Sequence, residues 1–535
     1  MNFHPKPPLL LPSLILTALL ACGGGKGGGG GDSPAPDPAD DSGGTDSAEP
    51  WTGGVLFGLA NLDDDDVDGQ GDWDQIEVVA DEDDLAAFLV PEGLDGQSLT
   101  LEGALVRVWR DGALLADGGG SFTVAAGETL QIELGAPAAA GFLRSESAEL
   151  RILAAPMLVN HHLLEAEASW AGADSSTGTA VPEAFGDVLG DAATDVPIGG
   201  YEYDIWVQDE VELVTTNLDD DRRIDIVIDS IRSNHGRGLD DFAEEMLAKD
   251  ELGIRTWGEG RATSQDSFGN MESTPPLTVG GVEYPFGRIY YGKWQTAAGA
   301  DEVTEDLREA LAAQTVQAPV ELNVGFLCVG HVDEFITFLP DPEAPRGFWL
   351  AVADTSLGLA FLDSQDPALT PTRYKPTHHY TTVGEMQEDA ALRAYNEDLQ
   401  RDGIEPALAT LLAATGLDEG DVLRLPALFE EVGWCYGTGV SLIPGTINMA
   451  VLPLPDGSVH VIMADPFWRE DSADIATDPF VAEIERLLPD SLTTHWADNW
   501  YTLHAMMGEV HCGSNIRRQP VAGTGALALS LLESR

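Results

Sequence analysis

The stretch GEVHCGSN, residues 508–515, sets Cys512 directly before a run of turn-forming residues. The sequence therefore predicts that this thiol lies at a turn rather than inside a strand. A cysteine in such a setting is a candidate nucleophile, whereas a cysteine in an apolar run is usually a small core residue. By the same reasoning Cys328, within FLCV, is expected to be a core residue, and Cys435 stays undecided.

Three segments upstream of Cys512 also concentrate reactive side chains. They are WVQDEVE (206–212), DSFGNME (266–272) and GHVDE (330–334). Each is a weak signal when it is taken alone, because a lone histidine beside an aspartate is more often structural than catalytic. Their order along the chain carries more information than any one of them.

Taken together, the four segments resemble those of the protein-arginine deiminases, calcium-dependent enzymes that convert peptidyl arginine to citrulline. The resemblance runs from about residue 53 to residue 520 and includes the stretch QAPVEL (317–322). It implies an α/β pentein catalytic domain, a five-bladed propeller of ββαβ units, over residues 157–520. It also implies a preceding all-β, immunoglobulin-like sandwich that binds calcium, over residues 51–156.

The catalytic residues follow by position from this resemblance. Cys512 would be the nucleophile, His331 the general acid and base, and Asp209 and Asp333 the carboxylates that bind the guanidinium group. Two carboxylates can accept paired N–H bonds from a planar guanidinium and so fix its plane. Attack by the thiolate would give a covalent thiouronium, which water converts to citrulline with release of ammonia.

Substrate contacts are implied in the same way. Trp206 would lie along the aliphatic stem of arginine. Arg232 and Arg237 would hold the peptide backbone, although the loop that carries them is longer here than in the animal enzymes. Surface charge is the alternative interpretation for both arginines.

Calcium is the cofactor that the resemblance implies, at two sites in the catalytic domain. One site would use Gln208, Glu212, Glu272 and the carbonyl groups of Phe268 and Met271. The second would use Glu210, Asp229 and Ser230, with Asn234 as a further candidate. Alternation along a strand would send Gln208, Glu210 and Glu212 toward the metals and Asp209 toward the substrate.

A dense acidic run, NLDDDDVDG (61–69), lies in the sandwich domain. Carboxylates packed this closely repel one another unless a cation lies among them, and calcium takes six to eight oxygen ligands. The family register implies Asn61, Asp63, Asp65, Asp81 and Asp84 as ligands. A register shifted by one, through Asp64, Asp66 and Asp68, and a solvated loop are the alternatives.

The N-terminus is typical of an exported lipoprotein. An apolar run over residues 9–20 ends in LLAC, which resembles a lipobox with Cys22 as the lipidated residue. Residues 1–22 are then the signal peptide and residues 23–50 a flexible linker rich in Gly, Asp, Pro and Ser. We expect a chain anchored to the bacterial cell envelope by lipid alone, on the periplasmic or the outer side. A cleaved signal peptide with a chance cysteine is the alternative.

Composition narrows the possible partners. The chain has 27 Lys and Arg against 91 Asp and Glu, a formal net charge of −64, which excludes nucleic acid as a favoured partner. The four cysteines show no zinc spacing, and no disulfide framework is indicated in a chain of this size. We expect an arginine-containing protein or peptide as the substrate, and the oligomeric state stays open.

Two other functions remain open at this point. The first is a pentein hydrolase or amidinotransferase that acts on free arginine, agmatine or methylarginine. The second is an inactive, calcium-stabilised adhesion or scaffold lipoprotein. The tail, residues 521–535, is unlike the aromatic ending of the family.

Overall fold

The computed structural model describes residues 53–62, 85–146, 148–173, 178–219, 222–232, 238–247, 252–258, 262–297 and 299–534. The predicted signal peptide, the linker and Cys22 lie outside these ranges. So do the candidate residues Asp63, Asp65, Asp81, Asp84, Asn234 and Arg237. No helix in these ranges combines the length and the apolar composition needed to cross a membrane.

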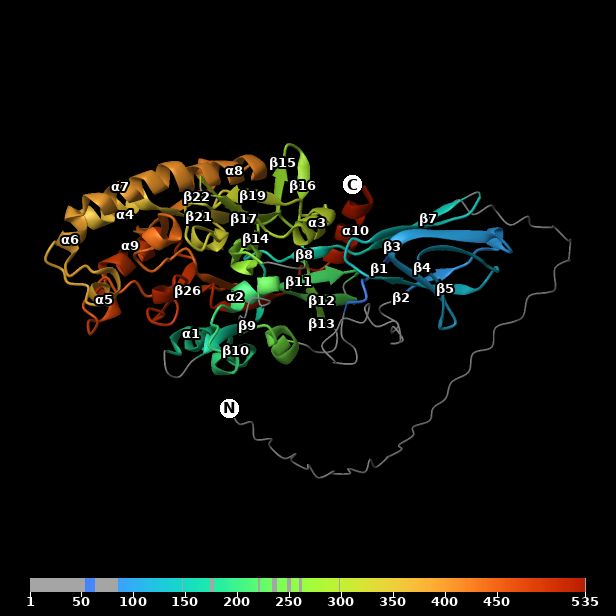
Figure 1. Cartoon of the computed structure of the whole chain (residues 1–535), viewed down its shortest axis with the longest axis horizontal. Helices are drawn as coiled ribbons and strands as arrows, with labels where there is room; N and C mark the ends of the chain where they lie inside the picture. The colour runs from blue at the N-terminus through green and yellow to red at the C-terminus, as the bar shows by residue number, and fades with distance from the viewer. Residues whose placement is uncertain are drawn as a thin grey trace, which may run out of the picture. The chain divides into compact units, whose positions relative to one another are not determined.

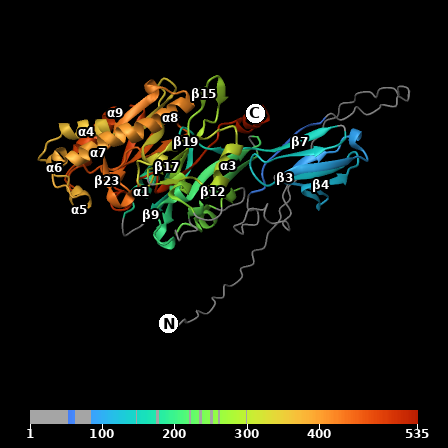
Figure 2. The same cartoon turned by 45° about the horizontal axis from the view of Figure 1, so that its top comes forward.

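The first described part of the chain is all-β, as predicted, and its strands β3, β4 and β7 lie together in Figure 2. The long strand β3 pairs with β6 through Thr100–Glu102 and with β5 through Val106–Trp109, so it links the two halves of one seven-stranded sheet. Leu99, Leu101, Val106 and Val108 are buried in the core of this part of the chain. An immunoglobulin-like connectivity stays a prediction. The strands are β1 (Gly54–Gly58), β2 (Leu85–Leu89), β3 (Ser98–Arg110), β4 (Ala113–Thr123), β5 (Thr129–Leu134), β6 (Ala140–Arg144) and β7 (Glu149–Ala154).

Seven smaller sheets follow within the described ranges, and the five that have three or more strands share one pattern. In each, the middle strand pairs antiparallel with one neighbour and parallel with the other. The pentein expectation of five ββαβ-like units is therefore confirmed. Each unit is given below as three strands, in which the second is the middle strand, the first pairs antiparallel with it and the third pairs parallel with it. The units are β28 (Ser514–Arg518), β9 (Ala166–Ala173), β10 (Ala193–Pro197); β11 (Val211–Asn217), β12 (Arg223–Asp229), β13 (Leu252–Thr256); β14 (Met271–Ser273), β17 (Ile289–Thr296), β19 (Val320–Asn323); β20 (Ile336–Pro340), β21 (Phe348–Asp354), β22 (Val422–Pro426); and β25 (Ala450–Pro453), β26 (Val459–Ala464), β27 (Leu492–Ala497).

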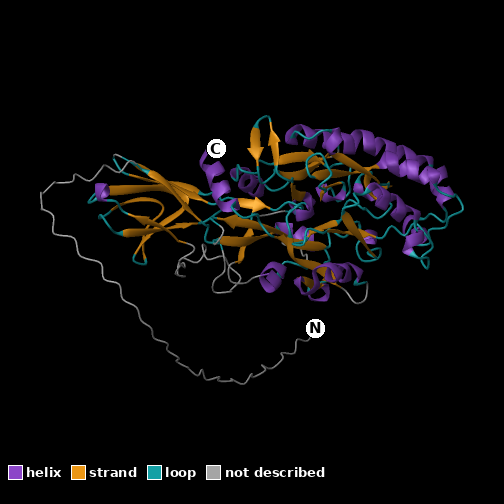
Figure 3. Cartoon of the chain, turned by 180° about the vertical axis from the view of Figure 1, so that it is seen from behind, coloured by secondary structure: helices purple, strands orange, loops and turns teal. Residues whose placement is uncertain are grey.

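Parallel neighbours require a crossover connection, and a helical segment supplies it in each unit. The fourth unit has the longest crossover, in which α7, a π-helical turn and α8 form one run along a border of the domain (Figures 1 and 3). The crossover segments are α1 (Ala180–Leu189), the π-helical turn η6 (Ala243–Leu247), α3 (Glu305–Ala313), α9 (Pro479–Leu487) and, in the fourth unit, α4 (Thr355–Ser364), α5 (Tyr374–His378), α6 (Val383–Glu388), α7 (Ala390–Leu399), η10 (Gln400–Ile404) and α8 (Glu405–Thr415).

Short elements complete the domain and carry several site residues. Two hairpins are formed by β15 (Leu277–Val279) with β16 (Val282–Tyr284), and by β23 (Phe429–Val432) with β24 (Thr438–Ser441). Further elements are β8 (Met157–Val159), β18 (Gly299–Asp301), α2 (Val207–Glu210) and the 3-10 turns η8 (Phe268–Asn270) and η9 (Val332–Glu334).

The C-terminal tail, which departs from the family pattern in sequence, forms helix α10 (Thr524–Ser534). Its buried Leu529 packs in a core with Val214, Ile226 and Phe268. Leu59 and Leu62, which follow β1, belong to the same core. Both ends of the described chain therefore pack against the sheets that carry the candidate site.

Candidate active site

Residues 206–212 do not form the continuous strand that the sequence predicted. Val207–Glu210 is one helical turn, α2, and the strand β11 begins only at Val211. The backbone N–H of Glu210 bonds to the carbonyl of Trp206, which closes the turn. Gln208 and Glu212 still share a face, because Gln208 Nε2 donates to Glu212 Oε2 at 2.6 Å. Asp209 instead points toward His331, so these side chains diverge by a different geometry from the predicted strand, and their roles stay a prediction.

Three candidate catalytic side chains converge on Gly269, at the centre of η8. A Cβ on Gly269 would lie 2.9 Å from Asp209 Oδ1, 3.0 Å from Asp333 Oδ2 and 3.0 Å from His331 Nδ1. Only the absence of a side chain there leaves room between these groups. Two acids and an imidazole from three distant segments thus surround one point, as the sequence predicted.

His331 lies between Asp209 and the backbone of Ser264. Its Nε2–H donates to the Ser264 carbonyl at 2.8 Å, and Nδ1 is 3.4 Å from Asp209 Oδ1. Burial alone would lower the pKa of His331, but Asp209 and Asp333 more than offset it and raise that pKa to about 9. The imidazole is therefore protonated at neutral pH and is prepared to act as a general acid.

Cys512 is buried, and its Sγ lies 3.5 Å from Asp333 Oδ2. Asn448 Nδ2 donates to the sulfur at 3.1 Å, and Asn448 Oδ1 accepts the Cys512 N–H at 3.2 Å. Burial, together with the charges of Asp333 and Asp209, raises the pKa of Cys512 well above its ordinary value. In the free protein these groups therefore favour the neutral thiol over the thiolate.

Trp206 lies beside the backbone that carries Cys512. A Cβ on Gly508 would overlap the six-membered ring of Trp206 and would lie 3.3 Å from Cys512 Cβ. Gly508 therefore allows the indole to lie close to the thiol, which fits its predicted contact with the arginine stem. A small hollow of about 20 Å³ lies beside Cys512, with Glu334, Asn448 and Gly508 in its lining.

Arg232 is not a surface residue, so that alternative interpretation is wrong. Its guanidinium is buried: Nε donates to Glu210 Oε2 at 2.7 Å and NH2 to Asp204 Oδ2 at 3.1 Å. A third carboxylate, that of Asp209, is 3.7 Å away. A contact with a peptide backbone stays a prediction.

The first predicted calcium set is brought together. Gln208, Glu212 and Glu272 line one hollow of about 20 Å³, and Gln208 Nε2 also donates to the Phe268 carbonyl at 3.4 Å. Met271 directly precedes Glu272 at the start of β14. Burial and the charge of Glu272 raise the pKa of Glu212 well above its ordinary value. Two close carboxylates in a buried hollow suit a cation.

The second predicted set also gathers acids. Asp229 Oδ1 is buried and has no hydrogen-bond partner among the described residues. Burial and the neighbours Glu210 and Glu244 raise the pKa of Asp229 to about 8. Ser230 adjoins these acids through its backbone, because its N–H donates to the Glu210 carbonyl. Its hydroxyl does not face them and donates to the Asp266 carbonyl.

Of the predicted sandwich set, only Asn61 is described. Its side-chain Nδ2 donates to Glu133 at 3.1 Å. Its Oδ1 is buried and has no hydrogen-bond partner among the described residues. An unsatisfied buried acceptor at this position is compatible with the predicted ligand role.

Sequence reasoning missed two residues that touch the catalytic groups. Asn448 holds Cys512, and His511 Nδ1 donates to Asp333 Oδ2 at 2.9 Å. His511 lies beside Cys512 in the quoted motif, so its position was a signal. Asn448 lies in a loop without a motif, and nothing local singles it out.

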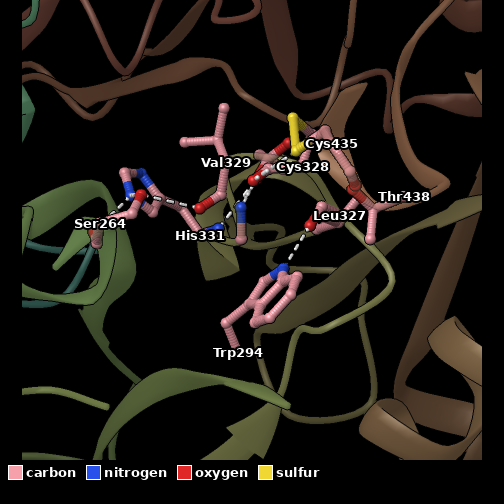
Figure 4. The surroundings of a disulfide bond; sticks show 10 residues. Ser264, Trp294, Leu327, Cys328, Val329, His331, Cys435 and Thr438 are labelled. Carbon is pink, nitrogen blue, oxygen red and sulfur yellow. Dashed lines mark hydrogen bonds between the residues drawn. A yellow bond between two sulfur atoms is a disulfide. The ribbon is translucent and has the colours of Figure 1, made fainter. Parts of the chain in front are cut away.

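The sequence indicates no disulfide framework, leaves Cys435 undecided and places Cys328 in the core, but one bond forms between these two residues. Cys328 and Cys435 are bonded, with their Cα atoms 5.7 Å apart. Figure 4 shows this bond beside the segment that leads to His331. The bond depends on two segments that are distant in the sequence. The backbone N–H of Cys328 donates to the carbonyl of Gly439, in β24, at 2.9 Å. That pairing brings the β23–β24 hairpin, and with it Cys435, against an apolar run.

Comparison with known proteins bears on the same region. The family described as protein-arginine deiminase (PAD) matches residues 144–524. The human type-1 and type-4 protein-arginine deiminases are each 32% identical, over 59% of this chain and over 46% and 47% of their own lengths. The chain thus spans about half the length of the curated relatives it matches. Among solved structures, an agmatine deiminase from C. jejuni aligns at 11% identity and a TM-score of 0.33, over 68% of this chain and 97% of that one.

Proposed function

Because the chain belongs to the protein-arginine deiminase family, we propose that it hydrolyses the guanidinium group of protein-bound arginine to citrulline and ammonia. The observation that carries the proposal is the convergence of Asp209, Asp333 and His331 on Gly269. Cys512, 3.5 Å from Asp333, completes the set. A thiol, an imidazole and two carboxylates around one point are the groups that this chemistry needs.

Binding and activation are coupled through charge. The carboxylates of Asp209 and Asp333 accept the N–H groups of the substrate guanidinium. The same two carboxylates raise the pKa of Cys512 in the free protein. A bound guanidinium neutralises them, so the substrate itself favours the thiolate that attacks it.

His331 donates and then accepts the proton that the reaction transfers. The Cys512 thiolate forms a C–S bond with the guanidinium carbon, and protonated His331 gives its proton to the departing nitrogen as the C–N bond breaks. Neutral His331 then takes a proton from water, whose oxygen attacks the same carbon. The C–S bond then breaks as the added hydroxyl becomes the carbonyl of citrulline, its proton passes to solvent and so to the released ammonia, the thiolate is restored, and citrulline leaves.

Calcium dependence is part of the proposal. The ligands would be Gln208, Glu212 and Glu272 with the carbonyls of Phe268 and Met271, and Glu210 with Asp229. The unsatisfied Asp229 Oδ1 and the close pair Glu212 and Glu272 support a cation at both places. When bound, calcium would supply the positive charge that keeps these buried carboxylates ionised.

Substrate choice is tested with matched guanidinium compounds. Purified protein is incubated with an arginine-containing peptide, free arginine or agmatine, with and without calcium. We expect ammonia release and citrulline by mass spectrometry with the peptide and calcium, and none with Cys512→Ser. Equal or faster turnover of free arginine or agmatine would contradict the peptidyl substrate, and no turnover would favour the scaffold alternative.

We also propose that the chain is exported and anchored through Cys22. The disulfide between Cys328 and Cys435 supports this, because such bonds persist in oxidising compartments outside the cytoplasm. Mass spectrometry of the mature N-terminus is the test. A lipidated Cys22 is expected, and a soluble product cleaved elsewhere would contradict the anchor.

A further inference from the structure

Two histidines and one glutamate form a compact buried group next to the candidate active site. His162 Nε2 lies 3.0 Å from Glu272 Oε2, and His511 Nε2 lies 3.3 Å from Glu272 Oε1. One ligand atom from each of the three residues falls within 4.8 Å of the other two. Each histidine therefore turns its Nε2 toward the same carboxylate.

The other nitrogen of each imidazole is held from outside the group. His162 Nδ1 is 3.0 Å from Thr337 Oγ1, and His511 Nδ1 is 2.9 Å from Asp333 Oδ2. Histidines that bind metal through one nitrogen usually donate the other N–H to an oxygen, which fixes the ring. Both rings are oriented in this way.

The spacing of the ligand atoms suits a small ion. Bonds of about 2.0–2.2 Å in a tetrahedral site set the ligand atoms about 3.3–3.5 Å apart. The two N···O distances, 3.0 and 3.3 Å, are close to that value. A hollow of about 20 Å³ adjoins all three residues, which is room for one water-sized species.

We propose that His162, Glu272 and His511 form a binding site for one divalent transition-metal ion, such as zinc or cobalt. In the bound state each Nε2 faces the ion without a proton, and each ring carries its one proton on Nδ1, toward Thr337 Oγ1 or Asp333 Oδ2. Any proton that an Nε2 carried beforehand passes to solvent or to Nδ1 as the ion enters. Imidazole nitrogens select such ions over calcium, which prefers oxygen ligands.

The charges around the hollow favour a cation. Glu212 and Gln208 line it and can supply a further oxygen ligand. Arg518 also lines it, and its positive charge opposes the ion, but its guanidinium is bound to the carbonyls of His162, Leu164 and Val451. The carboxylates of Glu212 and Glu272 outnumber this one cation. Because Glu272 also belongs to the proposed calcium set, a transition-metal ion there competes with calcium.

Cobalt(II) absorption tests the site without any need for turnover. The full chain carrying Cys22→Ser and Cys512→Ser, which keeps only the bonded Cys328 and Cys435, is titrated with cobalt. We expect the intense visible bands of a four- or five-coordinate ion at one equivalent. The many surface carboxylates bind cobalt only in the weakly absorbing six-coordinate form. Zinc should displace the cobalt and abolish the bands.

Matched variants make the test specific. His162→Ala should weaken cobalt binding by about 100-fold or more, and Thr337→Val, which keeps all three ligands, by about 10-fold. The control is His495→Ala, because His495 Nε2 lies 2.9 Å from His460 Nδ1 in a second histidine pair far along the chain. It should leave the bands unchanged. Thr337→Val decides the matter if thermal melting shows that His162→Ala does not fold. Absence of the bands, or their persistence in Thr337→Val at unchanged affinity, would overturn the proposal.

Discussion

Asn448 holds Cys512 by both ends of its amide, since Nδ2 donates to the sulfur at 3.1 Å and Oδ1 accepts the Cys512 N–H at 3.2 Å. The first contact stabilises the thiolate and the second fixes the backbone beneath it. A hydrogen bond to a charged group contributes about 1.5–3 kcal/mol, which is about 10- to 150-fold in rate. Asn448→Ala should therefore lower kcat by that factor, with a parallel fall in the rate at which iodoacetamide alkylates Cys512.

Asn396 provides the matched control for this variant. Its amide also makes two bonds to one residue, donating to the Phe429 carbonyl at 2.8 Å and accepting the Phe429 N–H at 2.9 Å. Asn396→Ala should lower the melting temperature without slowing the alkylation of Cys512. If the two variants affect alkylation equally, Asn448 has only a structural role.

Gly269 is predicted to be the residue on which the pocket depends. Alanine there would place a methyl group within 3.0 Å of Asp209, His331 and Asp333, in the space that the guanidinium needs. The contacts are with the ends of side chains, so the fold should survive while activity falls by about 100-fold or more, comparable to the loss of a key catalytic donor. Gly186→Ala, where a Cβ meets no atom within 4 Å, should keep full activity. Near-normal turnover by Gly269→Ala would mean that substrate binds elsewhere.

The chemistry of the site was predictable because it resides in short motifs, whereas its assembly was not. Cys512, His331 and Asp333 could be named from two short segments, although Cys512 lies 179 residues from Asp333 in the sequence. The five-unit fold followed from resemblance only, since the units share a strand pattern and not a sequence repeat. The turn at Val207–Glu210 was misread because WVQDEVE does not separate a strand from one helical turn. Asn448 and the Cys328–Cys435 bond depend on loops that meet only in the folded chain.

The acidity of Cys512 should respond to Asp333 in a way that separates reactivity from catalysis. Asp333 raises the pKa of the thiol. Asp333→Asn should therefore lower that pKa, so that the rate of alkylation by iodoacetamide begins to increase at a lower pH. One pKa unit would make alkylation about 10-fold faster near neutral pH. Citrulline formation should nevertheless be lost, because one guanidinium-binding carboxylate is gone. Slower alkylation in this variant would contradict the electrostatic account.

Asp229 should make the stability of the protein depend on pH and on calcium. Its pKa is about 8 in the folded chain, raised from 3.8 by burial and by Glu210 and Glu244. Between these values the folded state binds more protons than the unfolded state, so stability falls as pH rises toward 8. A shift of even one unit corresponds to about 1.4 kcal/mol.

Asp229→Asn should therefore raise the melting temperature at pH 8 without calcium, and should reduce the stabilisation that calcium gives. Asp225→Asn, on the same strand, removes an ion pair with Arg223 at 2.7 Å and should not stabilise. Thermal melts from pH 5 to about pH 8.5, with and without calcium, measure both variants. A melting temperature for wild type that rises toward pH 8 without calcium would contradict the sign of the effect.

The disulfide between Cys328 and Cys435 should matter more for unfolding than for the geometry of His331. It closes a loop with a sequence separation of 107, for which the loss of chain entropy on unfolding amounts to about 4–5 kcal/mol. Two backbone bonds of 2.9 Å, from the N–H of Cys328 to the Gly439 carbonyl and from the N–H of Gly439 to the Phe326 carbonyl, hold the same segments after reduction. Cys435→Ala should thus lower the midpoint of urea unfolding clearly while kcat falls only a few-fold. Peptide mapping of the denatured, unreduced protein checks the premise, because alkylation of both Cys328 and Cys435 would show that they are not bonded to each other.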